Sequence, residues 1–191
     1  MNKETLLNAF PKTLQSDVMA VLEILPLNSV YPIDDCNMVS DPIQAIRLDE
    51  EELFIPYRVY FDEPASMIVA RLTGIQKTIL NCIYLRHYDG FVRQKHLEAL
   101  GERNEYWTVP YLLQLLGEYV FEILEVLDKV ITEKNIKNFS RLTKENPKFW
   151  QRTEDRMVSY WDVYYRWGRF HKLQDYLGMQ IADRIRNAGV L

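Results

Sequence analysis

The sequence predicts a mainly α-helical protein: an irregular helical bundle with a small edge β-hairpin or extended arm near residues 43–61. Three observations favour this class. Apolar residues recur at helical spacing from about residue 64 onward. The chain has 7 glycines in 191 residues, too few turn signals for a β-sandwich. Apolar residues make up 48% of the chain and charged residues 26%, as in an ordinary globular protein that folds without disulfides or metal.

The first helix is predicted over residues 13–25, with Thr13 as its N-cap and Pro26 ending it. Residues 26–42 contain three prolines and no apolar period, which indicates an ordered loop or extended arm. One stripe of the helix is apolar: Leu14, Val18, Val21, Leu22 and Leu25.

A short β-hairpin follows. Residues 53–61 alternate apolar and polar side chains, and Pro56 confines this strand to a sheet edge. Its expected partner is the segment 43–48, joined through the acidic turn 49–52. Two strands alone are marginally stable, so we expect the hairpin to pack on helices.

Two helices are predicted next, and both have recognisable ends. Thr73 and Gln76 have the spacing of a capping box, which begins the first of them. Asp89-Gly90 ends it, and Gly101 stands where the second helix should end.

A long apolar stripe then predicts helical structure over residues 108–131, with Thr108 as N-cap and Pro110 in the first turn. Gly117 interrupts the stripe and marks either a break between two helices or a close helix crossing. The spacing of Glu118, Glu122 and Glu125 places these carboxylates on the solvated back of the helix.

Residues 73–131 read as a helix, a short turn and a helix, twice over. DGFVRQKHLEAL (89–100) is similar to the second helix of a HEAT-type repeat, with an Asp before the helix followed by Val-Arg. TVPYLLQLLGEYVFEILEVL resembles a first helix, a turn and a second helix of such a repeat. The resemblance implies stacked helix pairs, although the 28-residue offset between the two units is shorter than the family's roughly 40–47 residues.

Charge divides the chain into three parts within a single predicted domain, residues 1–191. Residues 1–65 carry 4 basic and 12 acidic side chains, net −8. Residues 66–146 form the expected helical core, and residues 147–191 the aromatic-rich C-terminal helices. From residue 148 onward there are 8 basic and 5 acidic side chains, net +3. The acidic and basic ends could complement each other within one fold.

The sequence also disfavours several classes of protein. The start MNKETLLNAF lacks the apolar core of a secretory signal, and no window is apolar enough for a membrane span. Cys36 and Cys82 show no ligand spacing, so we expect reduced thiols, a cytoplasmic location and no cofactor. The net charge of −4 disfavours nonspecific nucleic-acid binding.

The densest polar run lies between residues 86 and 96. His87, Asp89 and His96 form a candidate metal or acid–base site, although His96 falls about two turns into the next helix. The alternative is that Asp89 caps that helix while His87 or Arg86 meets the carbonyls ending the previous one. An anion held at the helix start by Arg86 and Arg93 is a further possibility.

The C-terminal aromatic segment is the more informative feature. As a single helix, residues 157–170 would be apolar over more than half of their circumference. One arc contains Trp161 and belongs to the core. Either the helix is sandwiched in the middle of the domain, or the second arc is an exposed surface bordered by a polar rim. In the second case its residues are Val163, Trp167 and Phe170, with Arg166 and Arg169 at the border.

These patterns predict a non-catalytic protein–protein interaction module that binds a protein partner or itself through its Trp/Tyr/Arg-rich C-terminal helices. Two alternatives stay open. One is a nucleic-acid-binding protein that uses this surface with Arg86, Arg93 and Lys95. The other is an enzyme centred on His87, Asp89 and His96. No catalytic motif is present, so the balance is against an enzyme.

Overall fold

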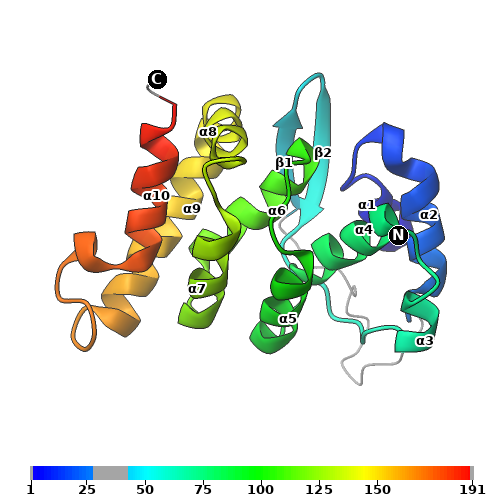
Figure 1. Ribbon diagram of the computed structural model, residues 1–191, viewed down its shortest axis with the longest axis horizontal. Helices are drawn as coiled ribbons and strands as arrows, with labels where there is room; N and C mark the ends of the chain where they lie inside the picture. Colours follow the sequence, from blue (N-terminus) through cyan, green and yellow to red (C-terminus); the bar gives the residue numbers. More distant parts are fainter. Residues whose placement is uncertain (1, 28–42, 190–191) are drawn as a thin grey trace. The chain divides into compact units, whose positions relative to one another are not determined.

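A computed structural model describes residues 2–27 and 43–189. Within these ranges the chain has ten α-helices and one two-stranded antiparallel sheet, so the predicted mainly α fold with a small hairpin is confirmed (Figure 1). The predicted arm over residues 28–42 lies outside the described residues. The chain forms two compact units, Met1–His96 and Leu97–Leu191, and each is described by itself.

The N-terminal unit packs its first helices against the hairpin and against α4. The buried stripe Val18, Val21 and Leu22 confirms the predicted apolar face, and the helix that carries it packs on α4. Thr13 does not cap that helix, because it lies inside a preceding 3₁₀ turn. The elements are α1 (Asn2–Leu7), the 3₁₀ turn η1 (Lys12–Leu14), α2 (Gln15–Ile24), β1 (Ile43–Leu48), β2 (Glu51–Pro56), α3 (Ser66–Val69), α4 (Gly74–Tyr84) and the first part of α5 (Gly90–Leu100).

The hairpin forms with the predicted partner, but its second strand is shifted. β2 starts at Glu51 and ends at Pro56, whereas the predicted strand ran over residues 53–61. Pro56 pairs with Ile43, the first residue of β1, and it has no N–H with which to extend the ladder. Beyond it, Val59 makes only an isolated bridge to His87.

Both predicted ends of the α4–α5 pair are confirmed. Thr73 and Gln76 form the capping box, each backbone N–H donating to the other side chain, at 3.0 and 3.3 Å. At the far end Gly101 has φ +61°, the left-handed conformation that glycine adopts without strain.

The C-terminal unit is built from five helices. α8, α9 and α10 pack against one another, α7 packs on α10, and α6 packs on α8. Leu112, Leu127, Phe139 and Ile181 are among the side chains that these contacts bury completely. The elements are α6 (Val109–Leu113), α7 (Phe121–Val130), α8 (Ile136–Glu145), α9 (Pro147–Tyr160), α10 (Leu177–Asn187), the 3₁₀ turns η2 (Tyr106–Thr108), η3 (Gln114–Gly117) and η5 (Leu173–Asp175), and the π-helix η4 (Trp161–Tyr165).

The helical stripe predicted over residues 108–131 is interrupted. α6 passes into the 3₁₀ turn η3, which ends at Gly117, and Glu118 is extended and buried rather than solvated. Its predicted place beside Glu122 and Glu125 on the helix back is therefore wrong. Thr108 occupies the predicted N-cap position of α6, and Pro110 lies in its first turn, but the Thr108 side chain makes no capping hydrogen bond. Its hydroxyl donates to the Glu105 carbonyl at 2.8 Å.

Gly117 combines the two expected roles, a break and a close crossing. A Cβ at this position would lie 3.4 Å from the Arg156 Cβ and 3.4 Å from the Thr153 carbonyl oxygen, both on α9. Larger side chains therefore have no room here.

We expect Gly117→Leu to destabilise the protein by about 1–3 kcal/mol, the usual cost of overpacking, because the added atoms would press against the α9 backbone. Urea unfolding measures the change. Gly168→Leu is the matched control, since no atom lies within 4 Å of a Cβ placed there. Unchanged or higher stability of the Gly117 variant would show that this crossing is loose.

Candidate functional site

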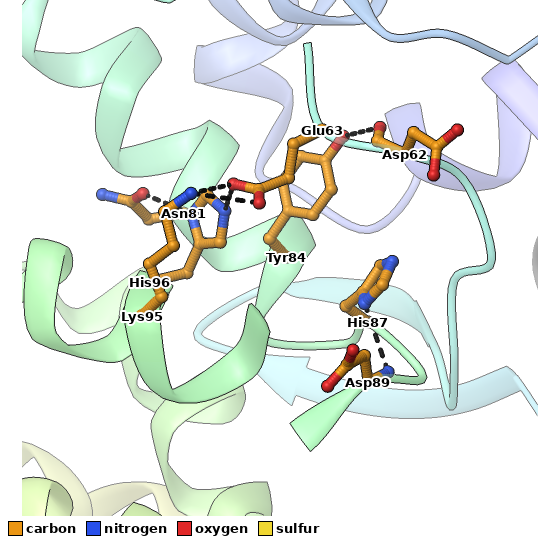
Figure 2. A network of polar contacts seen from close by, with 8 residues as sticks. All are labelled: Asp62, Glu63, Asn81, Tyr84, His87, Asp89, Lys95 and His96. Atoms are coloured by element: carbon orange, nitrogen blue, oxygen red, sulfur yellow. Dashed lines mark hydrogen bonds and ion pairs between the residues drawn. The ribbon is translucent and has the colours of Figure 1, made fainter. Parts of the chain in front are cut away.

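His96 lies in a polar cluster formed by three segments of the N-terminal unit (Figure 2). Its Nε2 is 2.8 Å from Glu63 Oε1, and its Nδ1 is 2.8 Å from Asn81 Oδ1. Asn81 comes from α4, His96 from α5, and Glu63 from the segment between the hairpin and α3. Both ring nitrogens of this buried histidine are thus occupied by side chains of the protein.

Lys95 and Tyr84 complete the cluster. The Lys95 ammonium is 2.8 and 3.0 Å from the two oxygens of Glu63, and it stays largely exposed. The Tyr84 ring stacks on the His96 ring with 4.6 Å between centroids. The Tyr84 hydroxyl donates to the Asp62 carbonyl at 2.6 Å, and burial raises the pKa of this hydroxyl. Tyr84 therefore packs against the cluster with its hydroxyl protonated.

The predicted grouping of His87, Asp89 and His96 does not form. The Asp89 carboxylate accepts the Phe91 backbone N–H at 2.8 Å, so Asp89 caps α5. His87 Nδ1 accepts the Asp89 N–H at 3.2 Å and lies in the same turn. The capping interpretation is confirmed. In the part of the chain that the structure describes, no three His, Cys, Asp or Glu side chains gather closely enough to hold a metal ion.

Arg86 and Arg93 are buried and serve the same turn. Arg86 donates to the Leu85 carbonyl, which lies just past the end of α4, at 2.7 and 2.9 Å. Arg93 donates to the carbonyls of His87 and Tyr88 at 2.7 and 2.8 Å. Their guanidinium groups stabilise the α4–α5 connection. The anion-site hypothesis requires both groups to be accessible from solvent, but both are buried.

Burial governs the charge of both histidines. Burial lowers the pKa of His96 below its usual value, and the hydrogen bond to Glu63 opposes this effect. Burial also lowers the pKa of His87, with Asp89 opposing. For Glu63, burial favours the neutral carboxyl, but hydrogen bonds from Lys95 and His96 outweigh it and hold its pKa below the usual value. Asn81 can meet neutral or protonated His96, because its amide carries both a donor and an acceptor.

We expect stability to fall as the pH is lowered from about 7 to about 5.5. In this window unfolded histidines take up protons that folded His87 and His96 do not, so protons favour the unfolded chain. The free energy of unfolding in urea at the two pH values measures the loss.

The double variant His87→Gln/His96→Gln should flatten this dependence. Equal stability of the unmodified protein at both pH values would contradict the lowered histidine pKa values.

The C-terminal unit carries the second candidate site, an exposed group of apolar side chains. Trp167 is 78% exposed, Val163 65%, Tyr164 59% and Tyr119 47%. Tyr119 and Tyr164 lie 5.9 Å apart between ring centroids. We call these four residues, with Arg166 and Arg169, the aromatic surface.

Trp161, in the same segment, is buried and belongs to the core, as expected. Its exposed fraction is 9%, and its indole N–H donates to the Phe170 carbonyl at 2.8 Å. The predicted contrast between a buried Trp161 and an exposed Trp167 is confirmed.

Phe170 was expected to share the exposed arc with Val163 and Trp167, but it is half-buried. Its ring packs on Phe121 at 5.4 Å and on Tyr176 at 5.7 Å. The difference arises because residues 157–170 are not one α-helix. The chain winds as a π-helix over Trp161–Tyr165 and then turns, which rotates Phe170 back toward the unit.

The two arginines border the aromatic surface differently. Arg166 pairs with Asp162 at 2.7 Å and lies 5.0 Å from the Trp167 ring centroid. Arg169 lies 4.2 Å over the Phe121 ring. It has no ion pair with any residue that the structure describes, so its charge is available to a partner.

Sequence reasoning missed Glu63 and Tyr119. Glu63 stands before Pro64 in a stretch without periodicity, and nothing in the sequence indicates that it meets a histidine 33 residues later. Tyr119 lies two residues after Gly117, and nothing in the sequence indicated that a break at Gly117 would leave its side chain exposed.

The chain matches no protein-family model, no curated protein and no solved structure. In the described ranges, no helix is both long and apolar enough to cross a membrane.

Proposed function

We propose that this chain is a non-catalytic interaction module that binds a protein through the aromatic surface. The observation that carries the proposal is Trp167, a large side chain that remains 78% exposed on an ordered turn. Large exposed apolar patches mark interaction sites, and the exposed Tyr119 and Tyr164, with ring centroids 5.9 Å apart, lie on the same unit as Trp167. Trp, Tyr and Arg are the residue types that most often dominate binding energy at protein interfaces.

The proposal favours a protein partner or a second copy over nucleic acid. The chain's net charge is −4, and Arg86 and Arg93, which the nucleic-acid alternative requires, are buried against backbone carbonyls. Binding to nucleic acid depends on phosphate contacts by exposed cations. We also propose a cytoplasmic location for the protein, as expected from the sequence.

The enzyme alternative finds less support than the binding role. A general base must present a free ring nitrogen to its substrate. Both nitrogens of His96 are engaged by Glu63 and Asn81, and His87 contacts the backbone of its own turn. In this proposal the cluster stabilises the N-terminal unit.

Photo-crosslinking tests the proposal. A benzophenone amino acid replaces Tyr164 in the aromatic surface, or Phe91 in the N-terminal unit as a control. Phe91 is an equally suitable position because its side chain is 84% exposed. Each protein is irradiated in lysate of the cells that make it.

We expect a defined protein adduct from position 164 that disappears when Trp167→Ala is added and persists when Phe91→Ala is added. An adduct that is independent of Trp167, or an identical pattern from positions 164 and 91, would overturn the proposal.

A further inference from the structure

An acidic hollow of about 350 Å³ lies on the N-terminal unit beside the hairpin turn. Phe10 and Phe54 provide apolar parts of its lining, and Glu50, Glu51 and Glu52 provide carboxylates. Its size is at the lower end of the range for ligand pockets, suited to one large side chain.

Hydrogen bonds hold the wall of this hollow in place. The Phe54 N–H donates to the Asn8 carbonyl at 2.9 Å, which ties β2 to the chain just after α1. The Lys12 N–H donates to the Glu51 carboxylate at 2.9 Å. Glu50 and Glu52 are exposed and have no ion pair with another residue in the described ranges. Lys12 also lines the hollow, so three carboxylates and one ammonium leave it a net charge of −2.

The aromatic surface has the complementary features. Trp167 projects into solvent, and its indole N–H has no acceptor among the described residues. Arg169 and Lys172 follow closely in the chain, and both are exposed and without an ion pair within the described ranges. An exposed indole with two unpaired cations two and five residues further along the chain is complementary to an apolar hollow edged by carboxylates.

We propose, building on the protein-binding role above, that Trp167 of one copy of this chain occupies the acidic hollow of a second copy. Arg169 and Lys172 then face Glu50 and Glu52 of that copy. The charge distribution supports this choice of occupant, because residues 1–65 carry net −8 and residues 148–191 net +3.

The contact joins two different surfaces, so after one contact one copy keeps an unused hollow and the other keeps an unused Trp167. These are filled either by reciprocal exchange within a dimer or by further copies that add head to tail. Self-association should therefore increase with concentration, and it should weaken with salt.

Sedimentation velocity on the full chain tests the contact with two variants. Trp167→Ala removes the inserted side chain, and Glu50→Lys/Glu52→Lys reverses the charge of the hollow. Glu51 is left unchanged because it holds the Lys12 backbone. Thermal unfolding followed by circular dichroism confirms that both variants fold.

We expect the unmodified protein to form dimers or larger species between about 10 and 500 μM, with each variant alone monomeric. An equimolar mixture should form a one-to-one heterodimer and nothing larger, because it contains one intact hollow and one intact Trp167. A mixture that stays monomeric, or a charge-reversed variant that still associates, would overturn the contact.

A monomeric unmodified protein would also overturn this inference. It would leave the proposed function standing if the Trp167-dependent adduct to a different protein is found. Loss of that adduct would instead contradict the proposed function itself.

Discussion

Trp161→Ala is expected to cost about 3–5 kcal/mol of unfolding free energy, the range for truncating a buried aromatic side chain. The indole is 9% exposed, and its N–H donates to the Phe170 carbonyl. The substitution leaves a cavity and deprives the Phe170 carbonyl of its donor, and both effects lower the free energy of unfolding. Urea unfolding at neutral pH measures the difference.

Trp167→Ala is the matched comparison, six residues further along the chain. We expect a change within about 0.5 kcal/mol, because a side chain that is 78% exposed contributes little packing. Similar losses for the two variants would mean that Trp167 supports the fold, and the aromatic surface would lose its main binding residue.

His96→Ala should have the second-largest effect, a loss of about 3 kcal/mol. The substitution removes a buried ring that stacks on Tyr84, and it takes from Asn81 its histidine partner and from Glu63 one of its two partners. The control is Lys95→Ala, which removes the lysine bound to Glu63.

Lys95 is largely exposed, and exposed ion pairs contribute little, so the control should lose no more than about 0.5 kcal/mol. If the two substitutions cost the same, the cluster would be held by surface charge and not by the buried histidine. Unfolding of both variants in urea distinguishes these outcomes.

Local signals predicted the parts of the fold that depend on neighbouring residues. The capping box at Thr73 and Gln76, the Asp89 cap and the left-handed Gly101 each require contacts within a few residues, and all are confirmed. The strand 43–48 was predicted with its observed bounds because its alternation matches its partner.

Tertiary packing explains where local patterns failed. The solvated face expected for Glu118, Glu122 and Glu125 requires an unbroken helix, but the chain breaks at Gly117, close to α9, and Glu118 is buried. Likewise, a constant 100° per residue cannot describe a segment that becomes π-helical at Trp161. The resemblance of residues 73–131 to HEAT-type repeats remains a prediction.

For the candidate sites too, features that depend on neighbouring residues were predicted, and contacts between distant residues were not. The exposure of Val163 and Trp167 and the burial of Trp161 followed from helical spacing within one segment. The pairing of His96 with Glu63 joins residues far apart in the chain, and no local pattern encodes it. Sequence spacing instead linked His96 with Asp89, which the structure places at the helix cap.

The aromatic surface as a protein-binding site is the central claim, and the affinity of the partner captured at position 164 tests it most directly. Isothermal titration calorimetry with that purified partner compares the unmodified chain with Trp167→Ala and Phe91→Ala. We expect Trp167→Ala to weaken binding at least about 30-fold, as for a residue that dominates an interface, and Phe91→Ala to leave it unchanged. An affinity of the Trp167 variant within about twofold of the unmodified chain would contradict the claim.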